Sequence, residues 1–509
     1  MSTTKNNTRH VAWKNLPSGI VPLFFIQIFS TLSFSVLYST LVLYITGELG
    51  LPANVANSIT GVFVAFNFAL HLLGGYWGGR IFSYRALFCL GMIAQVVGCL
   101  LLATQQLNYL YLGLGAFLTG SGLNVTCINC MLTQRFSPED NRRETAFLYN
   151  YAGMNLGFFI GFGLSGYFQI MHNYARLFEF SSVGNLIALF ICLYFLPVLA
   201  DKETHYTRLQ VRTQRQFFIV GVLFISMLPF VLSQFLHFAD FSNKMILVIG
   251  GIMLLLACWL GIKQKSWQAR MKLQAFVVLM VMGTLFWMLF QTAPMGLTHF
   301  IDHNVQRHWL FVTIPPQWFQ NINTLCIVIG GPAMSFILNR LRKRGVDVNV
   351  PAQFSLALLC IGVAFVLLPV GIAQASPSGL VAPIWVIFCF ILQSIGELLI
   401  SPIGYAMVGA LVPRSLQGVM MGMWMLASGV GATLASYCSN WMTEGVEGID
   451  PIVTNPGYSY VFLRLGLLAI TTAFVLMLLV PLLKRWIREE KATKTVTNQF
   501  DGQLIAGVE

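Results

Sequence analysis

The sequence predicts an all-α membrane protein with two six-helix bundles and an inserted two-helix hairpin, fourteen spans in all. Only 9% of the 509 residues are charged and 56% are hydrophobic, whereas about 25% of a typical soluble domain is charged. Apolar runs of about 20 residues, the length needed to cross the hydrocarbon core of a bilayer, recur along the whole chain. The basic residues are concentrated in every second loop between these runs.

The order of the apolar runs divides the chain into two halves. The first six lie near residues 17–46, 53–78, 84–104, 107–132, 145–171 and 177–200. Two more, near 217–239 and 243–263, stand between basic stretches at Asp201–Arg215 and Lys263–Lys272. The last six lie near 273–295, 317–340, 352–373, 381–409, 415–442 and 457–483. We therefore predict a tail over 1–16, an N-terminal bundle over 17–200, a linker over 201–272 with a hairpin at 217–263, a C-terminal bundle over 273–484 and a tail over 485–509.

The distribution of positive charge predicts the orientation. An even number of spans places both termini on one side, and the loops of that side hold 26 of the 30 basic residues. Lys and Arg are retained on the cytoplasmic side of a membrane. We therefore predict a multi-pass protein with cytoplasmic termini, and we attribute the net charge of +12 to topology rather than to nucleic-acid binding.

The layout indicates a secondary transporter rather than an enzyme. Two bundles packed around a cavity at the membrane midplane are common among such transporters. A glycine-rich loop with a lysine, which would cradle a nucleotide phosphate, is absent from the sequence. The only Cys-x-x-Cys pair, Cys127 and Cys130, stands alone, so we expect no bound metal and no cofactor.

One acid lies well inside a span. Glu397, in the stretch GELLISPIGY, is the only one of the 18 acids in that position. A charged residue at a helix centre costs about 2.5–3.5 kcal/mol on insertion scales, so it usually faces a cavity or a partner. No basic residue lies at comparable depth; Arg464 is near the outer end of its span. We expect Glu397 to take up a proton or a cationic substrate group; the alternative is a protonated packing residue.

Other residues inside the spans leave two interpretations open. Pro402 removes a helix hydrogen bond five residues after Glu397, which favours either a hinge or a purely structural kink. His71 is either a packed side chain or a candidate for proton coupling. The span amides either join neighbouring helices or line a site: Gln27, Asn124, Asn129, Asn155, Gln291 and Asn323. The span aromatics either pack or line the cavity: Tyr38, Tyr149, Trp287 and Trp424.

Four segments resemble the proton-dependent oligopeptide transporter (POT/PTR) family of the major facilitator superfamily. GELLISPIGYAMVGALVPRSLQGVMMGMWMLASGVGATLA resembles the tenth and eleventh core spans of that family, counted without the hairpin. RRETAFLYNYAGMNLGFFIG resembles the fifth, FWMLFQT the seventh and FQNIN the eighth. The resemblance keeps this order over nearly the whole chain. It implies the major facilitator fold, alternating access, proton-driven symport of small peptides and, because the hairpin is typical of bacterial members, a bacterial inner membrane.

The resemblance transfers the site residues unevenly. The family residues that hold the amino end of a peptide are retained as Glu397, Asn155 and Asn323, and the pocket tryptophan is retained as Trp424. The charged residues of the family are replaced. In the ExxER motif of the first span, the two acids are replaced by Gln27 and Ser30 and the arginine is replaced by Thr31. A further arginine of the family's first span corresponds to Tyr38 here. The family's lysine of the fourth span corresponds to Val125, and its acid of the seventh span corresponds to Gln291. Only the amine-binding end remains.

We therefore expect a secondary active transporter of small amine-bearing, peptide-like solutes, such as di- and tripeptides or their relatives, acting as a monomer. Coupling to protons is implied by the resemblance but should be altered, because the acids credited with it are missing. An exporter of cationic amines or drugs and a non-transporting membrane sensor remain as alternatives.

Overall fold

The computed structural model describes residues 16–137, 140, 142–309, 312–345, 349–443 and 450–487. Its first half contains six long helices: α1 (Ile20–Leu43), which the π-helical turn η2 (Tyr44–Glu48) extends, α2 (Ala53–Trp77), α3 (Tyr84–Ala103), α4 (Leu107–Thr133), α5 (Arg142–Ile170) and α6 (Tyr174–Tyr194). A short helix, α7 (His205–Arg208), leads to the hairpin of α8 (Val211–His237) and α9 (Ala239–Ile262).

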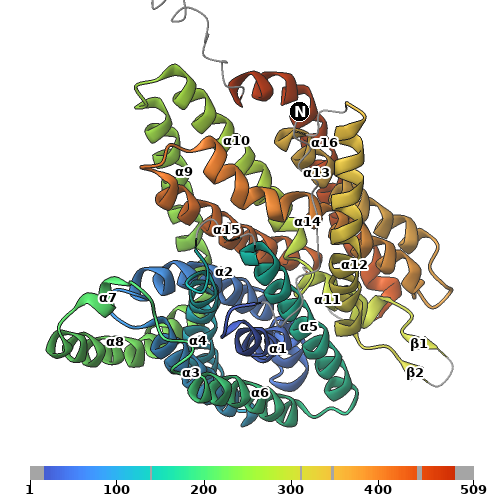
Figure 1. Cartoon of the computed structure of the whole chain (residues 1–509). Coiled ribbons are helices and arrows are strands. Elements are labelled where there is room, and N and C mark those ends of the chain that lie inside the picture. The colour runs from blue at the N-terminus through green and yellow to red at the C-terminus, as the bar shows by residue number, and fades with distance from the viewer. Residues whose placement is uncertain are drawn as a thin grey trace, which may run out of the picture.

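The second half contains α10 (Trp267–Phe290), the short α11 (Gly296–Asn304), α12 (Pro316–Lys343), α13 (Val350–Ala373), α14 (Pro383–Leu411), α15 (Gln417–Thr443) and α16 (Pro451–Ile487). Strands β1 (His308–Trp309) and β2 (Val312–Thr313) form a small antiparallel pair between α11 and α12. Figure 1 shows the two helical bundles, with α1–α6 in one and α10–α16 in the other. The predicted fold class, two six-helix bundles with an inserted hairpin, is confirmed.

Thirteen helices of the described residues are long and apolar enough to cross a membrane. The predicted span 145–171 corresponds to α5, which has 29 residues but is not among these thirteen. Its interior is less apolar because it carries buried Asn150 and Asn155 together with five glycines.

Several predicted boundaries differ from the structure by a few residues, and two of them have a clear cause in the sequence. The span 273–295 ends earlier, because α10 stops at Phe290 and α11 starts at Gly296. Pro294 lies in this break, where its missing N–H prevents a continuous helix. The last span was predicted from residue 457, whereas α16 already begins at Pro451, a residue suited to the first turn of a helix.

Each bundle has its own apolar core, and the two bundles meet along α2 with α15 and along α5 with α12 (Figure 1). Gly61 allows α2 to approach α15 closely, since an added Cβ would lie 2.6 Å from the Cβ of Ser436. Between the other pair, the Trp318 indole donates a hydrogen bond to the Gly163 carbonyl at 3.1 Å, and Gln317 donates one to Gln169. These two bonds join the C-terminal part of α5 to the first turn of α12.

The hairpin packs against the outside of both bundles. Helix α8 contacts α4, where an added Cβ at Gly115 would lie 2.4 Å from the Pro229 carbonyl oxygen. Helix α9 contacts α2, α10 and α15. Most of the apolar surface of the hairpin remains exposed in the single chain, as expected for helices that face lipid.

Candidate functional site

A cavity of about 480 Å³ lies between the two bundles, a size typical of pockets for small molecules. Nine long helices contribute to its wall: α1, α2, α3, α4, α5, α10, α12, α14 and α15. Among the described residues that line it, Glu397 is the only acid, and none is Lys or Arg. The cavity therefore contains one carboxyl group, and the other described residues of its wall are uncharged side chains and the imidazole of His71.

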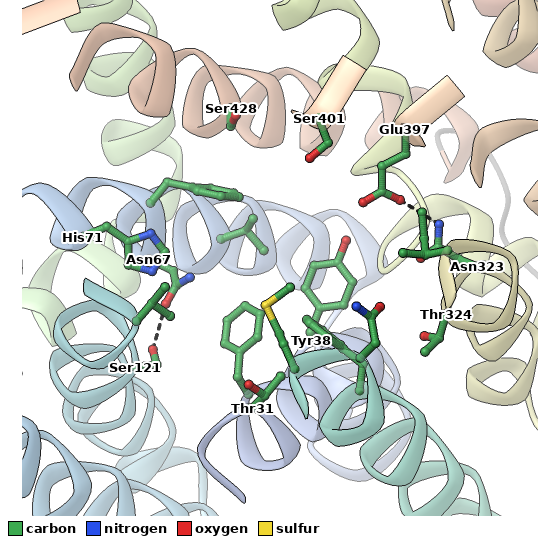
Figure 2. Close-up of a pocket in the computed structure, with 18 of the residues that line it drawn as sticks. Thr31, Tyr38, Asn67, His71, Ser121, Asn323, Thr324, Glu397, Ser401 and Ser428 are labelled. Atoms are coloured by element: carbon green, nitrogen blue, oxygen red, sulfur yellow. Dashed lines mark hydrogen bonds between the residues drawn. The ribbon is translucent and has the colours of Figure 1, made fainter. Parts of the chain in front are cut away.

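Glu397 is held by an amide from the neighbouring helix. The Asn323 Nδ2 of α12 donates to the Glu397 Oε2 of α14 at 2.8 Å and to the Ser394 Oγ at 3.0 Å. The ion pairs found among the described residues involve Asp140 and Asp302, not Glu397. Figure 2 shows the carboxylate pointing into the cavity beside Asn323. The side chain is thus oriented by a neutral donor, with its negative charge unmatched by a protein cation.

Trp424 of α15 forms another part of the cavity wall. Its ring is 3% exposed and rests on two glycines, Gly404 of α14 and Gly283 of α10. A Cβ at Gly404 would lie 2.1 Å from the indole, and one at Gly283 would lie 2.8 Å from it. These two positions need glycine so that the indole fits between α10, α14 and α15.

Tyr38 joins the two bundles. Its hydroxyl on α1 donates a hydrogen bond to the Gln291 Oε1 at the end of α10, at 2.8 Å. These are two positions at which the resemblance implies an arginine and an acid, respectively. A neutral hydrogen bond therefore connects the bundles at these positions.

The first-span motif is also replaced by neutral hydrogen bonds. The Gln27 Nε2 donates to the Thr31 Oγ1 at 2.8 Å, and the Asn150 Nδ2 of α5 donates to the Gln27 Oε1 at 3.1 Å. Ser30 donates to the Gln27 carbonyl oxygen at 3.2 Å. The acids and the arginine of the motif are replaced together, so no buried charge is left without a counter-charge among these contacts.

The structure places the other predicted residues as follows. Asn155 lines the cavity, but its Nδ2 donates to the Tyr151 carbonyl oxygen of its own helix rather than to Glu397. His71 also lines the cavity, across from Glu397 (Figure 2). Pro402 lies inside α14, which continues as a helix on both sides of it; its role as a hinge stays a prediction.

Several polar residues of the wall were not singled out from the sequence: Asn67, Gln95, Ser121, Ser401 and Ser428. Asn67 and His71 are four residues apart and therefore share a helix face. This spacing could have identified Asn67 from the sequence as a neighbour of His71. Gln95 offered no such signal, because α3 reaches the cavity only through the packing of α3 on α4.

Comparison with known proteins identifies the family. A family model described as PTR2, POT family, matches residues 81–452. The chain is 27% identical over 491 residues to the dipeptide and tripeptide permease B of Xenorhabdus bovienii, which covers 95% of this chain and 99% of the permease. It is 28% identical over 486 residues to the dipeptide and tripeptide permease A of Cronobacter turicensis, with 94% and 96% covered.

Solved structures share the fold. A peptide transporter POT in complex with sulfate has a TM-score of 0.80 at 22% identity, covering 94% of this chain and 97% of the other. A POT family transporter in complex with 5-aminolevulinic acid has a TM-score of 0.79 at 21% identity, covering 92% and 98%. A tetrameric relative, PepTSo2, has a TM-score of 0.80 at 20% identity, covering 92% and 98%.

The family match covers most of the chain and includes α14, α15 and the cavity wall that they form. The predictions of a transporter rather than an enzyme, and of the major facilitator fold, are thereby confirmed. The chain belongs to the POT family.

Proposed function

We propose that this protein is a secondary active transporter of small amine-bearing, peptide-like solutes, and that Glu397 binds their ammonium group. The observation that carries the proposal is the single acid in a cavity whose described wall contains no Lys or Arg. A carboxylate in such surroundings binds a cation by a charge-assisted hydrogen bond, about twice as strong as a neutral one. The permeases that the chain resembles are named for di- and tripeptides, which carry such a group.

The neighbours of Glu397 have supporting roles in this proposal. Asn323 fixes the carboxylate by its hydrogen bond, and Asn155 offers its amide from the opposite bundle. Trp424 and Tyr38 line the same cavity and shape its wall. Contacts from both bundles to one solute are what alternating access requires, because the solute must stay bound while one bundle rocks against the other.

The same carboxyl group determines how transport can be coupled to protons. An ammonium group and a proton compete for Glu397, so each lowers the apparent affinity for the other. If Glu397 alone serves both, the linkage favours exchange of solute for proton, or uncoupled passage, over symport. Symport needs a second proton site, for which His71 is the candidate. An imposed pH gradient across proteoliposomes distinguishes these cases by whether it drives uptake, drives efflux or does neither.

Location and assembly are part of the proposal. The concentration of basic residues in the loops on the side of the termini supports cytoplasmic termini in a bacterial inner membrane. A single chain contains the whole described cavity wall, which supports a functional monomer, although one relative was crystallised as a tetramer. Cysteine labelling of the tails tests the cytoplasmic location of the termini. The mass of the purified particle tests the monomeric state.

The test of function is flux in proteoliposomes made with the purified full-length protein. Alanyl-alanine and simple amines should accumulate, and Glu397→Gln should abolish this uptake. Glu48→Gln is the matched control, because Glu48 is an exposed acid at the end of η2. Unchanged flux in Glu397→Gln would refute the role of this residue. Export of cationic amines is the second candidate, favoured by the lack of a cation in the wall, and outward flux against a gradient would establish it.

A further inference from the structure

A group of polar residues lies across the cavity from Glu397. We call Asn67, His71, Gln95, Ser121 and Asn124 the N-bundle polar pocket; they come from α2, α3 and α4, and all line the cavity. Figure 2 shows His71, Asn67 and Ser121 on one side of the cavity and Glu397 with Asn323 on the other. The cavity therefore has an acidic end in one bundle and a polar end without a carboxylate in the other.

Several groups of this pocket are buried without a hydrogen-bond partner. Asn124 is 2% exposed, and neither its Oδ1 nor its Nδ2 is bonded to any described residue. Gln95 is 1% exposed with its Oε1 unpaired, and the Nε2 of His71 is also unpaired. Buried side-chain polar atoms usually have a partner in a folded protein. These atoms have almost no accessible surface in this structure, so a small rotation of the side chains that line the cavity is needed before they can serve a ligand as donors and acceptors.

The helix packing fixes these groups in position. A Cβ at Gly91 of α3 would lie 2.3 Å from the Asn124 Oδ1, so only glycine at this position leaves room for the amide. The Ser121 Oγ donates to the Asn67 Oδ1 at 2.8 Å, which joins α4 to α2. The Thr126 Oγ1 donates to the His71 carbonyl oxygen at 2.9 Å and makes a second link between the same helices.

The chemistry of the pocket selects a neutral group. A carboxamide or a hydroxyl has both a donor and an acceptor and can satisfy Asn124 and Gln95 together. A carboxylate can only accept, and its burial without a nearby cation is costly; no described residue of the wall is Lys or Arg. We propose that the N-bundle polar pocket binds a carboxamide or hydroxyl at the far end of the solute, so that the preferred cargo is a monocation rather than a zwitterion. This inference rests on the function proposed above.

The test compares three probes by calorimetric titration of the purified full-length protein: alanyl-alanine amide, alanyl-alanine and pentylamine. The amide should bind about tenfold more tightly than either of the others, the effect of one to two net hydrogen bonds. Asn124→Ala should remove this advantage of the amide and leave pentylamine binding unchanged. Asn57→Ala is the matched control, since Asn57 is also a fully buried amide of a span with both polar atoms unpaired, but it lies outside the cavity wall.

The outcomes separate this inference from the proposed function. Alanyl-alanine binding as tightly as its amide, or an amide affinity that survives Asn124→Ala, would overturn the inference. Pentylamine carries only the ammonium group, so its binding tests Glu397 alone. Retention of pentylamine affinity in Glu397→Gln would overturn the proposed function, whatever the result at Asn124. Retained pentylamine binding in Asn124→Ala also shows that this variant is folded.

Discussion

Replacing Glu397 by Gln removes one charge and keeps the shape of the side chain. The amide oxygen of Gln can still accept the hydrogen bond that Asn323 donates at 2.8 Å. An ammonium group about 3 Å from the carboxylate gains roughly 5 kcal/mol of Coulomb energy at an effective dielectric constant of about 20. Desolvation of both charges offsets part of this gain. The net loss on substitution should be about 2–3 kcal/mol, in line with hydrogen bonds to charged groups.

This loss corresponds to a 30- to 140-fold weaker affinity, taking about 1.4 kcal/mol per factor of ten. We would measure it by calorimetric titration of pentylamine and alanyl-alanine amide into wild-type protein and Glu397→Gln, with Glu48→Gln as the control for an exposed acid. Both ligands should weaken by similar factors, because both present the same ammonium group. A weakening of less than about threefold would refute the reasoning, since the carboxylate would then not be the counter-charge of the ligand.

Three further predictions concern the wall and its surroundings. Val125→Lys places a cation in the cavity wall and should reverse the preference between alanyl-alanine amide and alanyl-alanine in the same titration; an unchanged preference would contradict a neutral far end. Gly404→Ala should weaken binding of all amine probes at least tenfold, because its Cβ would lie 2.1 Å from the Trp424 indole and force the ring into the cavity; full affinity would show that the indole position is immaterial. Asp201→Ala should lower the midpoint of thermal unfolding through a loss of about 1 kcal/mol, because the Asp201 carboxylate accepts the Tyr84 N–H at the start of α3 at 2.9 Å; an unchanged midpoint would remove that capping role.

The sequence was informative wherever the bilayer imposes a rule. The length and repetition of apolar runs gave the helices and the hairpin, because each span must be long enough to cross the hydrocarbon core. Glu397 was recognisable from the cost of an acid in that environment. The break between α10 and α11 was harder to predict, because Thr292, Ala293 and Met295 around Pro294 are compatible with a continuing apolar run.

The sequence alone could not decide which span amides belong to the polar end of the cavity. An amide in a span bonds a neighbouring helix as readily as it lines a site, and composition does not distinguish the two. Asn323 does both, since it bonds Glu397 across helices and lines the cavity. Gln95 belongs to the wall only because α3 packs closely on α4 through Gly91 and Gly120. Such contacts are tertiary, so the group that we call the N-bundle polar pocket emerged only from the three-dimensional arrangement.

The most direct measurement is an experimental structure of the protein with alanyl-alanine amide bound. The proposal requires the ammonium nitrogen to lie about 2.7–2.9 Å from a carboxylate oxygen of Glu397, the usual length of a charge-assisted hydrogen bond. A ligand whose ammonium group is bound elsewhere, or a Glu397 side chain packed against lipid and out of reach of the solute, would contradict it.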